Sequence, residues 1–230
     1  MNKNLNKRKK AIKKPVAKKR KPIVASKKPN VAQLTRYEIV DEPMHDKSYV
    51  SLPHSVRETV DNLYDLVYTD LHKAIPPLLE LSEKYPHLPQ FKNYLNVAYM
   101  KSGETEKAEK MVFEIYQKHP DYLFGKSNYA LICLQKGKPE KIPEIFDNKL
   151  ELHLLYPGRK KFHISEYANF TAVMALYYLD TAQYEAAKTY YDSLEELNFD
   201  SDLTEMVKKR FLTEKLALLN QFVKNSESQR

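Results

Sequence analysis

The sequence contains few of the residues on which several common protein classes depend. Four glycines in 230 residues are too few for a glycine-rich phosphate loop or for a fold of many tight turns. The one cysteine, Cys133, cannot form a disulfide within the chain, which suits a reducing compartment. No run of about 18 apolar residues marks a membrane span, and no apolar segment follows the charged N-terminus as in a secretory signal. These absences predict a soluble, cytoplasmic protein.

Motifs of common enzymes are also absent. There is no His-Glu-x-x-His or paired-cysteine motif and no Gly-x-Ser-x-Gly nucleophile elbow. His153 and His163 are ten residues apart without a third ligand nearby, a spacing that fits no common zinc site. We therefore expect a non-enzymatic protein with no catalytic residues, cofactor or metal. An enzyme, or the regulatory domain of one, is the weaker alternative, which a deep pocket around these histidines and Glu166 would favour.

Negative charge is missing from the first 30 residues, which hold 13 Lys or Arg. The other 200 residues hold 25 basic and 30 acidic side chains, so a strongly basic segment precedes a mildly acidic body. The basic segment has three prolines and few large apolar groups, and its like charges repel one another. We expect residues 1–35 to form a disordered polybasic tail, because they cannot bury enough apolar surface to offset the entropy of ordering.

One function open to this tail is polyanion binding, since Lys and Arg displace counterions from a phosphate backbone whatever its sequence. Ribosomal RNA, other RNA or DNA fits this chemistry, and a nuclear localisation signal fits in a eukaryote. An acidic membrane surface fits less well, because no aromatic or lipidation signal accompanies the charge. A tail that only aids solubility is the plainest alternative. The residues expected to contact a polyanion are Lys7, Arg8, Lys9, Lys10, Lys13, Lys14, Lys18, Lys19, Arg20 and Lys21.

The body contains a pattern that recurs every 34 residues. The interval separates Gly103 from Gly137, Ala74 from Ala108, Leu78 from Val112, Leu81 from Ile115 and Pro86 from Pro120. A small apolar residue followed four and seven positions later by large ones places three side chains on one helix face. The later proline ends that helix. Upstream of each glycine, YLNVAYM (94–100) and YALICLQ (129–135) show another helical pattern.

The repeating unit is therefore helix, glycine turn, helix, proline turn, which resembles the tetratricopeptide repeat. The resemblance covers about residues 55–201 and implies an all-α, right-handed solenoid of helical hairpins. A linker at 36–54 precedes the repeat domain, which spans 55–225. Its expected parts are units at about 55–88, 89–122, 123–156 and 168–201 and a capping helix at 202–225.

Three of the units depart from the pattern. Pro76 and Pro77 lie within the second helix of the first unit and should kink or delay it. Two prolines should leave the second helix of the third unit short, over 140–146. In the fourth unit Ala182 stands where the turn glycine would be. An insertion at 149–167 separates the third unit from the fourth, and long loops carry function often enough to make it a candidate contact site.

The capping helix is expected because a repeat stack exposes an apolar face at each end. Its apolar stripe consists of Met206, Phe211, Leu212, Leu216, Leu219 and Phe222. The alternative is that this stripe binds a partner or a second copy of the chain.

The resemblance also implies a binding site. In tetratricopeptide-repeat proteins the first helices of successive units line a concave groove that holds a segment of another protein. The corresponding residues here are Asn93, Tyr94, Val97, Met100, Lys101, Phe124, Ser127, Asn128, Leu131, Gln135, Asn169, Val173, Leu176 and Asp180. Such a groove is mainly apolar with Asn at intervals, which suits an apolar or helical segment. Alternatively, these residues pack against the chain's own linker or capping helix.

We therefore expect a protein-interaction scaffold or adaptor whose groove binds a protein segment and whose tail supplies electrostatic attachment. The rival is a nucleic-acid- or ribosome-associated protein that binds mainly through the tail. Salt separates the two, because apolar contact survives about 0.5 M salt and phosphate contact does not.

Overall fold

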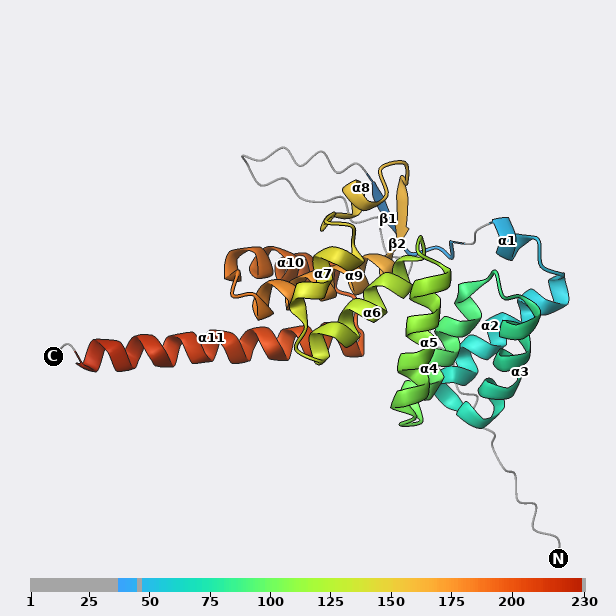
Figure 1. Ribbon diagram of the computed structural model, residues 1–230, viewed down its shortest axis with the longest axis horizontal. Helices are drawn as coiled ribbons and strands as arrows, with labels where there is room; N and C mark the ends of the chain where they lie inside the picture. The colour runs from blue at the N-terminus through green and yellow to red at the C-terminus, as the bar shows by residue number, and fades with distance from the viewer. Residues whose placement is uncertain (1–36, 45–46, 229–230) are drawn as a thin grey trace, which may run out of the picture. The chain divides into compact units, whose positions relative to one another are not determined.

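The computed structural model describes residues 37–44 and 47–228, so the expectations for the basic tail lie outside the described residues. Most of the described chain is helical, and consecutive long helices form antiparallel pairs (Figure 1). The elements are β1 (Glu38–Val40), α1 (Lys47–Val50), α2 (His54–Thr69), α3 (Leu71–Lys84), α4 (Pro89–Lys101), α5 (Thr105–Lys118), α6 (Leu123–Gln135), the 3-10 helix η1 (Pro139–Lys141), α7 (Ile142–Ile145), α8 (Leu152–Leu155), β2 (Lys161–His163), α9 (Ile164–Asp180), α10 (Tyr184–Leu197) and α11 (Asp202–Ser228). No described helix is long and apolar enough to cross a bilayer.

The repeat expected from the sequence is present. Helix α2 packs on α3, α4 on α5 and α9 on α10, and each first helix also contacts the next one, α2 on α4, α4 on α6 and α6 on α9. Ala74, Ala108 and Ala187 occupy equivalent places in α3, α5 and α10, and all three are fully buried. A methyl group there lets neighbouring helices approach closely. The all-α architecture of stacked helical hairpins is confirmed.

The turns within the hairpins share one backbone geometry. Gly103, Gly137 and Ala182 have φ of 78°, 66° and 56°. In each turn this residue's N–H donates to the carbonyl three residues back, and the following N–H donates to the carbonyl five residues back. This is the Schellman arrangement, which requires the left-handed conformation that glycine adopts most easily. Ala182 therefore holds a glycine position, as its place in the repeat predicts.

We predict that Ala182→Gly stabilises the protein by about 0.5–1 kcal/mol. A Cβ in the left-handed region costs about 1–2 kcal/mol, and the greater freedom of glycine in the unfolded chain offsets part of the gain. The reverse change, Gly103→Ala, should destabilise by a similar amount, because the new Cβ meets no atom within 4 Å and only the backbone is strained. Gly158→Ala is the control that should not destabilise, since its surroundings are equally open and its φ is not left-handed. Urea unfolding measures all three, and a loss of stability in Ala182→Gly would contradict the assignment.

The prolines of the first unit do not delay its second helix. Helix α3 begins at Leu71, where the carboxylate of Asp70 accepts the N–H of Lys73 at 3.3 Å, and runs past both prolines to Lys84. An Asp at the N-cap satisfies a backbone N–H that has no partner within the helix. Pro76 is exposed and so is His72, whose carbonyl loses its helical donor to the proline. Water can reach that carbonyl, so the proline is tolerated.

The second helix of the third unit is short, as expected, and a buried lysine lies at its end. The ammonium of Lys126, on α6, donates to the carbonyl oxygen of Ile145 at 2.8 Å and lies 3.3 Å from the carboxylate of Asp147. Asp147 and Asn148 are both left-handed, with φ of 53° and 57°. A cation at the carbonyl end of a helix satisfies groups that lack an intrahelical partner. Helix α7 therefore ends after one turn and the chain turns away.

We predict that Lys126→Ala lowers the free energy of unfolding by about 2–4 kcal/mol. The carbonyl of Ile145 loses its buried donor, and the missing side chain leaves a cavity. Lys136→Ala is the matched control at the end of the same helix, because Lys136 forms an exposed pair with Glu109 and such pairs contribute less than about 1 kcal/mol. Equal losses for the two variants in denaturant unfolding would contradict this role of Lys126.

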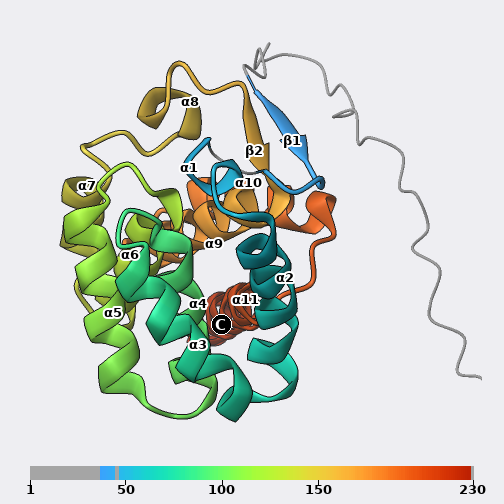
Figure 2. The ribbon, with the colours of Figure 1, turned by 90° about the vertical axis from the view of Figure 1, so that its right-hand side faces the viewer.

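A small sheet was not foreseen in the sequence. Strands β1 and β2 lie side by side and parallel, with Glu38 opposite Lys161 (Figure 2). The first strand comes from the expected linker and the second from the insertion. The linker also contributes Tyr49 and Leu52, which are buried against the first hairpin and the start of α4. These residues are therefore part of the folded body rather than a plain connection.

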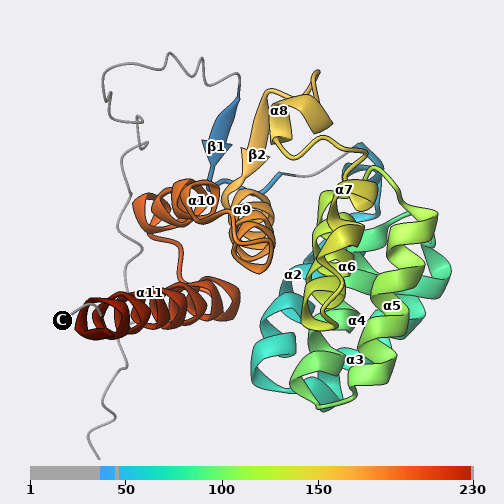
Figure 3. The same ribbon diagram turned by 60° about the vertical axis from the view of Figure 1, so that its left-hand side comes forward.

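Only the first turns of α11 cover the end of the stack. They pack on α9 and α10 (Figure 3), where Val207 is fully buried and Phe211 stacks on a tyrosine of α10 with ring centroids 4.5 Å apart. Leu212, Leu216 and Leu219 were expected to belong to the covering stripe, but they are 49%, 61% and 52% exposed. The helical period explains this correction, because Leu216 lies nine residues after Val207 and hence about 180° around the helix.

Candidate protein-binding groove

A row of asparagines joins the first helices of the second, third and fourth units. Nδ2 of Asn128, on α6, donates to Oδ1 of Asn93, on α4, at 2.9 Å. Nδ2 of Asn169, on α9, donates to Oδ1 of Asn128 over a longer distance of 3.4 Å. Asn93 is buried, and the other two are partly exposed. The stacking of the hairpins thus brings three of the expected groove residues together, with their amides oriented in the same sense.

This row ends in polar atoms whose hydrogen-bonding capacity is unused. Oδ1 of Asn169 is buried and has no partner among the described residues, and the same holds for Oγ of Ser127 on α6. An unpaired buried acceptor is costly. Both atoms are buried, so the row offers a bound peptide the partly exposed amide of Asn128, which carries donors and acceptors.

Aromatic side chains lie on the first helices of the first two units. Tyr64 and Tyr68, on α2, are 48% and 55% exposed. The ring of Tyr64 is 5.5 Å from that of Tyr94 on α4, and the ammonium of Lys101 lies 4.7 Å from the centre of the Tyr68 ring. The sequence reasoning missed the two α2 tyrosines. The available signal was their spacing of four residues, which places the two rings beside each other at the edge of the buried face of α2.

The surface beside Tyr68 is hollowed. A shallow depression of about 480 Å³ is lined by Val67, Tyr68, Thr69, Asp70, Leu71, His72 and Lys101. Burial raises the pKa of Tyr68 to about 12, and it raises the pKa of Tyr94 as well. Both hydroxyls therefore stay protonated at neutral pH and can donate hydrogen bonds. On α4, Val97 is partly buried and Met100 is 51% exposed, which adds apolar surface.

The third unit contributes less open surface than expected. Phe124 and Leu131 are partly buried and Gln135 is exposed. Ser127 has no exposed surface, which corrects the expectation that it lines an open groove. On α6, contact with a bound segment therefore falls to Phe124, Leu131 and Gln135.

The fourth unit is largely closed. Val173 has no exposed surface and Leu176 has 6%, because both lie in the core shared by α6, α9 and α10. Asp180 pairs with Arg210 of α11 at 2.9 Å. Burial raises the pKa of Asp180, and the arginine opposes this. These three residues therefore do not line an open groove, and the alternative of packing against the chain's own capping helix holds for Asp180.

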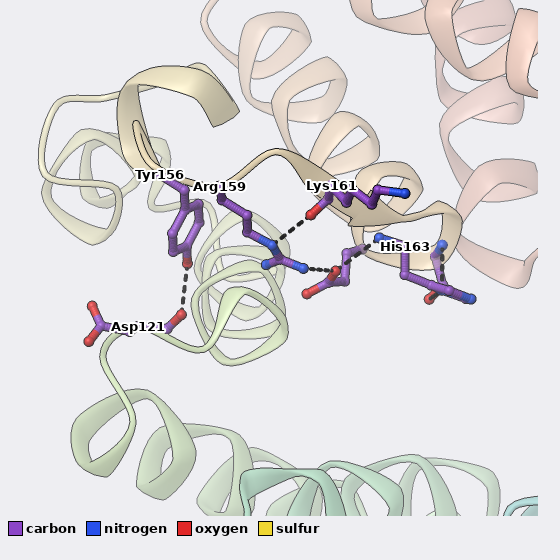
Figure 4. A network of polar contacts seen from close by, with 7 residues as sticks. Asp121, Tyr156, Arg159, Lys161 and His163 are labelled. Atoms are coloured by element: carbon purple, nitrogen blue, oxygen red, sulfur yellow. Dashed lines mark hydrogen bonds and ion pairs between the residues drawn. The ribbon is translucent and has the colours of Figure 1, made fainter. Parts of the chain in front are cut away.

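The insertion is held in place by a polar network (Figure 4). The hydroxyl of Tyr156 donates to the carbonyl oxygen of Asp121 at 3.0 Å. The guanidinium of Arg159 pairs with the carboxylate of Glu166, which also accepts the backbone N–H of His163 at 3.1 Å. The side chain of His163 caps the start of α9, so that it and Glu166 form a capping box. These contacts hold β2 against the start of α9 and give each of these side chains a structural role.

The two histidines of the insertion have separate partners. His153 lies 3.1 Å from the carboxylate of Glu151, and Nδ1 of His163 is 2.7 Å from Oγ of Ser165. Among residues 37–44 and 47–228, no group of three or more His, Cys, Asp or Glu side chains is arranged to hold a metal ion. Both histidines are thus accounted for by local pairing.

Comparison with known proteins agrees with the helical repeat. Over 134 residues, 58% of this chain, the sequence is 26% identical to the TPR repeat-containing protein YvcD of Bacillus subtilis (strain 168). The match covers 25% of that protein's length. No family model matches the sequence, and no solved structure matches the chain. The chain therefore resembles tetratricopeptide-repeat proteins in its sequence and in its stacked hairpins.

We predict that Asn128→Ala lowers the free energy of unfolding by about 1–2 kcal/mol. The change removes the central member of the row, so Asn93 and Asn169 each lose their hydrogen bond to Asn128. Gln135→Ala is the matched control on the same helix, since Gln135 is exposed, and it should change stability by less than about 0.5 kcal/mol. Urea unfolding compares the two. A loss no larger in Asn128→Ala than in the control would show that the row makes no net contribution.

Proposed function

We propose that this protein is a non-enzymatic, cytoplasmic interaction scaffold that holds an apolar or helical segment of a partner protein along α2, α4 and α6. The arm of basic residues at its N-terminus adds electrostatic attachment. Stacked hairpins of this kind offer extended concave surfaces for binding, and the likeness to a TPR repeat-containing protein supports the same class of function.

The observation that carries the proposal is the combination of exposed aromatic groups with the asparagine row. Tyr64, Tyr68 and Met100 are each about half exposed, and large exposed apolar groups of this kind are the usual anchors of protein interfaces. Asn128, partly exposed on the neighbouring helix, supplies a polar group for a bound backbone. A segment with apolar side chains and free main-chain groups fits both features. The burial of Val173 and Leu176 in the core and the pairing of Asp180 with Arg210 of α11 restrict this surface to the first three units.

A second candidate function rests on the tail. Its 13 basic residues without a carboxylate support a nucleic-acid- or ribosome-associated protein. Such binding releases counterions and weakens steeply with salt.

Affinity isolation from extract of the source cell tests the proposal with three variants of the full chain. The groove variant carries Tyr64→Ala, Tyr68→Ala and Met100→Ala. Its matched control carries Leu79→Ala, Phe113→Ala and Tyr184→Ala, which are also exposed but lie on second helices. The tail variant replaces the ten predicted polyanion-binding residues, Lys7 to Lys21, by Gln.

We expect the wild type to recover a protein partner that stays bound at about 0.5 M salt and after nuclease treatment. The groove variant should bind this partner at least tenfold more weakly. The control and tail variants should retain it. Recovery that is equal for the groove variant and its control would overturn the scaffold proposal. Recovery that depends on the tail and is abolished by nuclease would establish the second candidate instead.

A further inference from the structure

The part of α11 beyond Phe211 carries three exposed leucines. Leu212, Leu216 and Leu219 are spaced by four and three residues, which places them on one side of the helix. They are 49%, 61% and 52% exposed. Val207, which anchors α11 to the body, lies on the opposite side. Figure 1 shows α11 continuing past α10.

A basic rim surrounds these leucines. Lys208, Lys209 and Lys215 are exposed, and none of them takes part in the ion pairs found within residues 37–44 and 47–228. At about 100° per residue, Lys209 lies about 20° beyond one edge of the leucine face, and Lys208 and Lys215 lie about 20° and 40° beyond the other. Carboxylates are absent from the leucine side between Leu212 and Leu219. Glu205 shares that side but lies seven residues before Leu212, and Glu227 lies eight residues after Leu219. Asp202 and Glu205 are in its first turn, and Glu214 is engaged by Arg210 at 3.2 Å.

A second copy of the chain is a poor occupant for this face. Pairing two copies of α11 would bring the lysine rims of both helices together, and like charges at a contact are unfavourable. Three half-exposed leucines also provide far less than the roughly 800 Å² per partner of a stable interface. A coiled coil needs at least three or four heptads, whereas this stripe spans about one.

An anionic lipid surface satisfies both features at once. Its acyl boundary takes leucine side chains to a depth of about 5–10 Å, and its phosphates pair with lysines whose stems extend along the apolar surface. Because the leucines and Val207 lie on opposite sides of α11, the helix can lie flat on the membrane while the repeats stay on the aqueous side. We propose that α11 is a membrane-surface helix that binds anionic phospholipid.

The basic N-terminus adds to this interaction. Each Lys or Arg near an anionic surface contributes about 1 kcal/mol of attraction, and stable attachment to a membrane requires two signals. The 13 basic residues at 1–30 supply charge, and the leucines supply the apolar contact that a charged tail lacks. This site is separate from the groove, so its failure would leave the scaffold proposal untouched.

Vesicle sedimentation of the full chain tests the proposal. The stripe variant carries Leu212→Gln, Leu216→Gln and Leu219→Gln, because glutamine keeps the helix propensity of leucine. The matched control carries Val50→Gln, Leu79→Gln and Leu154→Gln, which are 53%, 37% and 47% exposed on other helices. Phosphatidylcholine vesicles with and without phosphatidylglycerol are the probes. We expect the wild type and the control to bind the anionic vesicles alike, and the stripe variant to lose at least tenfold in its partition coefficient.

A fluorescent label distinguishes insertion from adsorption by the charged tail. An environment-sensitive dye is placed on Leu216→Cys in a Cys133→Ala background, which removes the chain's one natural cysteine. The matched label is placed on Gln117→Cys, an exposed site on α5. Anionic vesicles should shift the emission of the first label to the blue, also at about 0.5 M salt, and should leave the second unchanged.

Four results would overturn the proposal. The first is equal vesicle binding by the stripe variant and the control, which would assign all lipid binding to charge alone. The second is an unshifted emission from the label at position 216, which needs no stripe variant and so does not depend on how that variant folds. The third is a dimer of the wild type in lipid-free solution that becomes a monomer in the stripe variant. The fourth is capture of an acidic protein through the stripe without vesicle binding.

Discussion

The whole structure depends on one constraint, which is that a pair of amphipathic helices exposes apolar surface on both outer sides and must cover it with another pair. Buried alanines at equivalent places in α3, α5 and α10 allow the close approach that this stacking needs. The constraint also aligns the first helices, since each must contact the next. The asparagine row of α4, α6 and α9 is a consequence of that alignment, because residues about one repeat apart come to lie beside each other.

The third unit shows how the stack accommodates an interruption. Its second helix is reduced to a single turn that ends at the ammonium of Lys126, and α6 consequently packs directly along α9. The chain that would have completed this helix instead forms the insertion. A parallel strand pair and the contacts of Arg159 with Glu166 fix it against the start of α9. The break in the repeat is therefore compensated by local polar contacts rather than by a further hairpin.

Much of the fold follows from the sequence because the repeat is encoded in residue types with a physical meaning. Glycine at a left-handed turn and alanine at a close helix contact are needed wherever the hairpin recurs, so even Ala182 could be placed. The strands could not be foreseen, since three-residue segments show no usable alternation. The role of Lys126 was also hidden, because a lysine in a helix is usually solvent-exposed. Val173 and Leu176 were misplaced for a related reason. The rule that first helices line a groove does not show which of their residues are buried in the core, as Val173 and Leu176 are.

The stacked hairpins present two surfaces, a partly polar groove on the first helices and a basic leucine face on α11. Both exist only if neighbouring hairpins are aligned as described. A double-mutant cycle on Asn93→Ala and Asn128→Ala, measured by urea unfolding, tests that alignment most directly. We predict a coupling free energy of about 0.5–1.5 kcal/mol, as for a hydrogen bond between contacting residues. If the two single-mutant losses of stability instead sum to the loss in the double mutant within about 0.3 kcal/mol, the side chains of Asn93 and Asn128 do not interact. That result would contradict the alignment of α4 with α6.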